Sequence, residues 1–150
     1  MTESMDKPRE AAPWHLWLVG AVAVLWNGYG AFGYLLTHLQ GEAFLRSAGM
    51  TEAQIAFTTG GPAWMTAAWA IGVWAALAGS LLLLLRSKWA FHAFLLSIAG
   101  FVGSMIYTHL LSTGGEVMGP SGAAINVMVG VSLILFALYA RRMTARGVLR

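Results

Sequence analysis

Histidine and carboxylate side chains recur at the ends of two apolar segments of this sequence. His38 and His109 each lie at the end of such a segment, Glu42 follows His38 by one helical turn, and Glu116 lies in the connection after His109. Imidazole and carboxylate groups are ordinary ligands of Zn²⁺. The four residues come from three separate segments and no close pair of ligands repeats, so we expect no metal site and no cofactor.

One amide, Asn27, lies in the middle of a long apolar stretch, where an unpaired amide would cost several kcal/mol. Two interpretations of this residue remain open. It could form the floor of a pocket for a sugar or another small neutral molecule, together with the three tryptophans Trp26, Trp69 and Trp74. Alternatively, it could join two helices by bonding to an indole N–H, Ser97 or Ser104. Both interpretations predict that Asn27 and the three tryptophans face inward.

The other side chains offer little for catalysis. The chain contains no cysteine, which excludes thiol catalysis, thiolate metal sites and disulfides. A membrane enzyme would need a nucleophile with a positioned base, or a metal ion. Only the dispersed histidines and glutamates described above are candidates, so we expect the protein not to be an enzyme.

The residues that could bind a ligand must be positioned by membrane-spanning helices. Four stretches, at 14–39, 62–85, 89–112 and about 121–140, contain no Asp, Glu, Lys or Arg, and each is long enough to cross a bilayer. The first stretch is too long for a signal peptide. With 58% apolar and 10% charged residues, the sequence predicts an all-α fold, a single membrane domain over residues 1–150. Its four helices should form an antiparallel up-down bundle.

Lys and Arg are distributed unequally between the two ends of the predicted bundle. Eight lie in the termini and in the turn at 86–88, whereas loops 40–61 and 113–120 contain only Arg46. The positive-inside rule therefore predicts cytoplasmic N- and C-termini. The basic end would attract anionic membrane lipids. We expect no nucleic-acid binding.

Small residues at helical spacing predict how the helices pack. They repeat every four positions in the second span and in the third, which lets two backbones approach closely; the positions are Ala68, Gly72, Ala76 and Ser80, then Gly100, Ser104 and Thr108. The turn at 86–88 is so short that these two spans should form an antiparallel hairpin. Gly28, Gly30 and Gly33 favour similar close packing by the first span, with a locally loosened helix as the alternative.

Loop 40–61 is longer than neighbouring helices require. Its sequence predicts two short amphipathic helical turns, the second begun by a capping box of Thr51 and Gln54. We expect its apolar side chains to enter the membrane interface as a surface cap, or as a lid over a ligand pocket; these side chains are Phe44, Leu45, Ile55 and Phe57.

Several sequence elements resemble those of one known group of proteins. They include the string from Leu25 to Phe32, Pro62-Ala63-Trp64, the segment from Ala67 to Trp74, the leucine run ending at Arg86, and the loop from Glu116 to Pro120. The resemblance is to a small bacterial four-helix inner-membrane family whose members are often labelled sugar transporters. It covers nearly the whole chain and implies a multi-pass protein of a bacterial inner membrane with a transport function.

Physical considerations limit what such transport could be. Four helices barely enclose a path wide enough for a sugar, so the substrate would lie at a junction between subunits of an oligomer. Because no acidic residue lies within a predicted span, we expect transport or binding without proton coupling. The alternative is a non-catalytic accessory or scaffold subunit of a larger membrane complex, which needs only packing surfaces.

Overall fold

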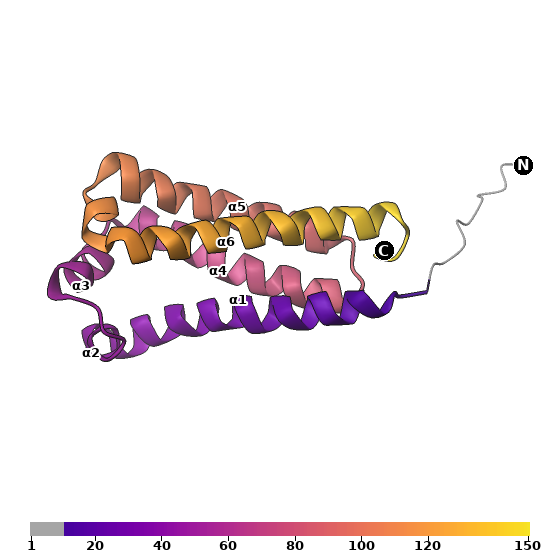
Figure 1. Cartoon of the computed structure of the whole chain (residues 1–150), viewed down its shortest axis with the longest axis horizontal. Helices are drawn as coiled ribbons and strands as arrows, with labels where there is room; N and C mark the ends of the chain where they lie inside the picture. The colour runs from indigo at the N-terminus through magenta and orange to yellow at the C-terminus, as the bar shows by residue number, and fades with distance from the viewer. Residues whose placement is uncertain (1–10) are drawn as a thin grey trace, which may run out of the picture.

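The computed structural model describes residues 11–150, and all the regular structure within this range is helical (Figure 1). Four long helices are apolar enough to cross a membrane. They are α1 (Trp14–Gln40), α4 (Ala63–Leu84), α5 (Trp89–Ile106) with its π-helical extension η1 (Tyr107–Leu111), and α6 (Gly114–Ala145). Two short helices, α2 (Glu42–Ser47) and α3 (Glu52–Thr59), join α1 to α4. The all-α class and the four long apolar helices are confirmed, as expected for a multi-pass membrane protein.

The long helices run alternately up and down and pack in chain order. Helix α1 packs against α4, α4 against α5, and α5 against α6. The start of α1 and the end of α6 therefore lie at the same end of the bundle, and α2 and α3 lie at the other (Figure 1). We call these the terminal end and the loop end. The assignment of the terminal end to the cytoplasm stays a prediction, and Lys7 and Arg9, which contribute to it, lie outside the described residues.

The predicted hairpin of α4 and α5 is confirmed, and Gly100 lets the two helix backbones approach each other closely. A Cβ atom added to Gly100 would lie 2.6 Å from the Ala68 backbone oxygen and 2.7 Å from the Gly72 backbone nitrogen. The Ser97 hydroxyl donates a 2.6 Å hydrogen bond to the Gly72 backbone oxygen at the same crossing. Small residues thus allow backbone-to-backbone contact and a hydrogen bond between helices, the two interactions that hold helices together in lipid.

The close packing predicted for the glycines of α1 is wrong for two of them. A Cβ atom added to Gly30 or Gly33 would meet no heavy atom within 4 Å, and at Gly28 it would touch only Leu77, at 3.9 Å. A different stripe of α1 is buried, and it consists of Leu16, Gly20, Ala23, Asn27 and Ala31. Spacings of three and four residues place this stripe on one side of the helix, which packs against α4.

The chain after α6 is also packed, although the sequence indicated only an arginine-rich tail. Gly147 has a φ of +75°, which turns the chain back so that Val148 and Leu149 are buried in the core at the terminal end. The Lys88 backbone N–H donates to the Arg150 oxygen, and the Arg150 N–H donates to the Arg86 oxygen, both at 2.8 Å. The last residues are therefore fastened to the turn between α4 and α5.

Helix α6 consists of two helical parts that meet at a kink at Gly119. The expectation of a loop over 113–120 is wrong, because this segment is helical from Gly114. The predicted start of the fourth span at about 121 agrees with the start of the second part. Gly119 has a φ of +68°, a left-handed conformation that favours glycine, and Pro120 follows it. Proline cannot donate a backbone hydrogen bond, but its fixed φ suits the start of the membrane-spanning part.

Helices α2 and α3 form the cap at the loop end. The Thr51 and Gln54 capping box is confirmed, with hydrogen bonds of 3.0 and 3.2 Å between the two residues. Leu45 and Ile55 are buried against the protein, so the expectation that they enter the membrane interface is wrong. The side-chain amide of Gln54 also donates to the Val117 backbone oxygen on α6. These contacts hold the cap on the bundle.

Candidate ligand pocket at the loop end

Asn27 is buried and bonded within the bundle, as the sequence indicated. Its side-chain amide donates a 2.9 Å hydrogen bond to the Ser80 hydroxyl on α4, and Ser80 donates in turn to the Ala76 backbone oxygen. The expected partners Ser97 and Ser104 were the wrong ones, because both lie on α5 and α1 packs against α4. In this position, Asn27 joins two helices.

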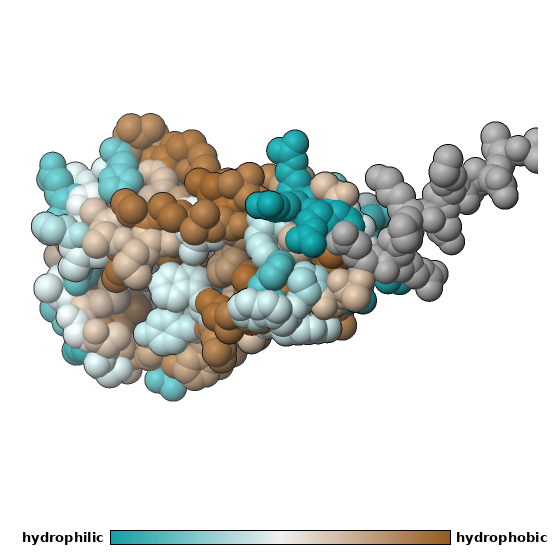
Figure 2. All heavy atoms as spheres, turned by 45° about the vertical axis from the view of Figure 1, so that its right-hand side comes forward, coloured by the Kyte–Doolittle hydropathy of each residue, from teal (hydrophilic) through white to brown (hydrophobic). Residues whose placement is uncertain are grey.

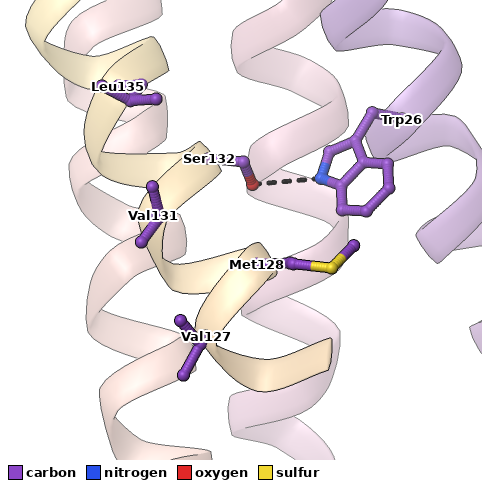
Figure 3. Close-up of a pocket in the computed structure, with 6 residues that line it drawn as sticks. All are labelled: Trp26, Val127, Met128, Val131, Ser132 and Leu135. Atoms are coloured by element: carbon purple, nitrogen blue, oxygen red, sulfur yellow. Dashed lines mark hydrogen bonds between the residues drawn. The ribbon is translucent and has the colours of Figure 1, made fainter. Parts of the chain in front are cut away.

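Trp26 faces α6 and lines a groove. Its indole N–H donates a 3.0 Å hydrogen bond to the Ser132 hydroxyl across the gap between α1 and α6 (Figure 3). The groove beside this bond has a volume of about 460 Å³ and opens to the outside of the bundle. The rest of its lining is apolar and comes from α6: Val127, Met128, Val131 and Leu135.

The other two predicted ligand-binding tryptophans lie on α4 around Tyr34 of α1. Trp69 and Trp74 both meet the Tyr34 ring edge-on, with centroid distances of 4.8 and 6.2 Å. Trp69 is half-buried, but Trp74 is 42% exposed, so the expectation that it faces inward is wrong. The four predicted ligand-binding residues line no common cavity, since Trp26 lines the groove on α6 and Trp69 lines a second cavity at the loop end.

This second cavity, which we call the threonine pocket, lies where α1, α3 and α4 meet. Its volume is about 220 Å³, and its lining is Thr37, His38, Thr58, Thr59, Thr66 and Trp69. Three of the threonines, Thr37, Thr58 and Thr59, donate 2.8 Å hydrogen bonds to backbone oxygens of their own helices. Their oxygen lone pairs are left to accept hydrogen bonds from a ligand.

His38 and Trp69 complete the pocket. The His38 ring stacks on Tyr34 at 4.2 Å, and its Nδ1 atom lies 2.9 Å from the Tyr34 backbone oxygen. Because a carbonyl oxygen only accepts, Nδ1 carries the proton in this hydrogen bond and Nε2 of the neutral ring remains as an acceptor. The Trp69 ring lies 5.9 Å from the His38 ring, centroid to centroid, and adds an aromatic surface.

The pocket has no charged wall. Its six lining residues include no Asp, Glu, Lys or Arg. Arg46 and Glu52 form an exposed pair at 2.7 Å on the neighbouring cap, and the hydrogen bond from Arg46 holds the pKa of the Glu52 carboxyl below its ordinary value. These two charges thus neutralise each other, and the lining favours an uncharged ligand with several hydroxyl groups.

Sequence reasoning missed most of this pocket. Thr58 and Thr59 were not among the predicted binding residues, and they lie in the last turn of α3. Thr37 and Thr66 gave no separate signal, because threonine is common near membrane boundaries. Their common location depends on how α3 packs at the loop end, which places Thr58 and Thr59 beside Thr37 and Thr66, and no local pattern indicated this arrangement.

The candidate metal ligands are not brought together. Among residues 11–150, no group of three or more His, Cys, Asp or Glu side chains could hold one metal ion. Glu42 instead lies 3.6 Å from the Arg46 guanidinium, and Glu116 lies in the first turn of α6. His109 packs beside Gly115, where a Cβ atom would lie 2.7 Å from its Nδ1 atom.

Comparison with known proteins identifies no family for this chain. No family model, no curated protein sequence and no solved structure matches it. The resemblance to the four-helix inner-membrane family is thus supported only at the level of four long apolar helices.

Proposed function

We propose that this membrane protein binds a small neutral molecule of sugar-like chemistry in the threonine pocket. One observation supports the proposal most: four threonines, a histidine and a tryptophan line one cavity that contains no charged side chain. Hydroxyl and imidazole groups can exchange hydrogen bonds with the hydroxyls of a sugar. The Trp69 ring offers an apolar surface for the C–H groups of the sugar, the combination typical of small-molecule sites.

The location of the pocket suggests how binding would serve the cell. If the arginine-rich terminal end lies in the cytoplasm, the pocket faces the exterior of a bacterial inner membrane. Passage of the bound molecule would then need an oligomer, since the pocket is confined to the loop end of one chain. Movement would be uncoupled from protons, because Glu42 and Glu52 lie on the cap and Glu116 precedes the kink at Gly119, where the membrane-spanning part of α6 begins. We propose no catalytic role.

Ligand binding by the purified protein tests this function. We expect glucose to bind in detergent micelles and gluconate, a charged probe of similar size, to bind far more weakly. Trp69→Ala should weaken glucose binding about tenfold, a loss of ~1.4 kcal/mol. Thr58→Val, which removes a hydroxyl at nearly constant volume, should also weaken it. Titration calorimetry would measure the dissociation constants.

Asn27→Ala is the matched control. It removes the buried hydrogen bond to Ser80 and should lower stability by about 0.6 kcal/mol, the average for such bonds in membranes, yet leave glucose binding unchanged. Equal binding of glucose and gluconate would contradict the proposal. So would loss of binding in Asn27→Ala together with retention in Trp69→Ala.

A second candidate function, that of a non-catalytic subunit in a larger complex, rests on Trp74. This residue lies in the middle of α4, is 42% exposed, and its indole N–H has no hydrogen-bond acceptor within residues 11–150. An indole N–H in the hydrocarbon region favours a partner with an acceptor. Under this hypothesis, a second protein or copy would co-purify with the wild type and be lost in Trp74→Phe, and glucose would not bind.

A further inference from the structure

Helix α6 has a continuous apolar face that no other helix covers. Only 17% of its most apolar stretch is buried, compared with 28% in each of the other three long helices. Its exposed residues Val127, Val131, Leu135 and Leu138 are spaced by four, four and three positions. They therefore lie on one side of the helix. The first three also line the groove beside Trp26 (Figure 3).

At the terminal end of the molecule, this apolar face is followed by basic residues. Arg142 follows Leu138 by four positions and so continues the stripe, and Arg141 is next to it; both are exposed. Hydrophilic side chains gather at this end of the molecule, beyond a largely hydrophobic middle (Figure 2). The glutamate side chains that the structure describes, Glu42, Glu52 and Glu116, all lie at the loop end, so none of them pairs with these two arginines.

We propose that the groove between α1 and α6 is a binding site for an anionic phospholipid. The headgroup phosphate would bind at Arg142 and Arg141, and one acyl chain would lie along α6 in the groove, against Leu135 and Val131. Arginine pairs with phosphate through two parallel hydrogen bonds, which suits it to this headgroup. The apolar lining suits a hydrocarbon chain.

The dimensions agree with this occupant. Arg142 and Val131 are eleven residues apart, which is about 16 Å along a helix at ~1.5 Å per residue. One leaflet supplies roughly 15 Å of hydrocarbon, half of a ~30 Å core. An acyl chain anchored at Arg142 would thus end near Val131 and the hydrogen bond between Trp26 and Ser132.

Charge argues against a second copy on this face. A two-fold dimer within one membrane would place the arginines of both copies at the same end and side by side. Like charges would then repel across the interface, whereas an anionic headgroup neutralises them. An anionic lipid would therefore both cover the apolar groove and neutralise the arginines at the terminal end.

Native mass spectrometry of the full chain tests this site. The protein would be released from nanodiscs that contain equal amounts of phosphatidylglycerol and phosphatidylcholine with the same acyl chains. We expect retained phosphatidylglycerol to exceed phosphatidylcholine. Arg142→Gln should lower its apparent affinity about fivefold, the effect of ~1 kcal/mol per basic residue at a membrane surface. Val131→Trp, which fills the groove, should lower retention of both lipids.

Two variants with similar changes outside the site serve as controls. Lys88→Gln removes an exposed charge from the same end, and Leu96→Trp enlarges an exposed side chain on α5; neither should alter lipid retention. Equal retention of the two lipids by the wild type would overturn the proposal. It would also be overturned by a dimer that Val131→Trp dissociates, or by equal competition from glycerophosphoglycerol, the headgroup without chains.

Discussion

Gly100→Ala should lower the free energy of unfolding by about 1–3 kcal/mol, the usual cost of overpacking a tight interior. The added methyl group would lie 2.6 Å from the Ala68 oxygen and 2.7 Å from the Gly72 nitrogen, and both are backbone atoms. Neither can rotate away as a side chain would, so α4 and α5 must separate. Their separation would also stretch the hydrogen bond from Ser97 to the Gly72 oxygen. Reversible unfolding in mixed micelles, followed by tryptophan fluorescence, would measure the loss.

Gly33→Ala is the control for this prediction. It makes the same chemical change in α1, where the methyl group would meet no atom within 4 Å. Because alanine favours a helix more than glycine does, the control should keep or slightly raise stability. Equal stability of the two variants would show that α4 and α5 do not cross at Gly100.

Leu149→Ala should lower the free energy of unfolding by about 2–5 kcal/mol, the range for a buried leucine. Leu149 is 3% exposed, in the core cluster at the terminal end. Its neighbour Val148 is fully buried, and the Val148 backbone oxygen accepts a 3.1 Å hydrogen bond from Arg86 Nε. A cavity here would loosen the backbone pairing of Arg150 with Arg86 and Lys88.

The matched comparison for this variant is Leu39→Ala. Leu39 is 72% exposed near the other end of the bundle, so its truncation should have little effect on unfolding. Faster hydrogen exchange at the Lys88 amide in Leu149→Ala alone would locate the damage at the fastened C-terminal turn. An unchanged exchange rate and an unchanged unfolding curve would mean that this turn is not packed in solution.

Much of the fold could be predicted from the sequence, because lipid imposes simple requirements on it. Long stretches without charge predict the four spans to within a few residues. The connection before the fourth span was expected as a loop, whereas it is helical from Gly114 up to the kink at Gly119. The small residues of α4 and α5 predicted their contact, but the lack of close packing at Gly30 and Gly33 depends on which face of α1 meets α4.

The candidate site was less predictable than the fold, because lipid constrains single residues such as Asn27 but not the way in which distant segments meet. Asn27 gave a clear signal because an amide in hydrocarbon must be paired, and its pairing with Ser80 explains its position. Of the two interpretations that the sequence left open, this pairing fits the one in which Asn27 joins two helices, and Asn27 lines neither the groove nor the threonine pocket. The threonine pocket is formed by residues from α1, α3 and α4, and only the return of α3 over the bundle brings them together. Long-range arrangements of this kind leave no local periodicity.

Labelling from the two sides of the membrane tests most directly whether the threonine pocket faces the cell exterior. The chain contains no cysteine, so single cysteines introduced at two exposed positions, Ala53 on α3 and Ala145 at the end of α6, would be the only reactive thiols. In intact spheroplasts, a membrane-impermeant maleimide should label Ala53→Cys, and it should label Ala145→Cys only after permeabilisation. The reverse pattern would place the pocket in the cytoplasm, and labelling of both positions in intact spheroplasts would contradict an even number of membrane crossings with a cytoplasmic terminal end.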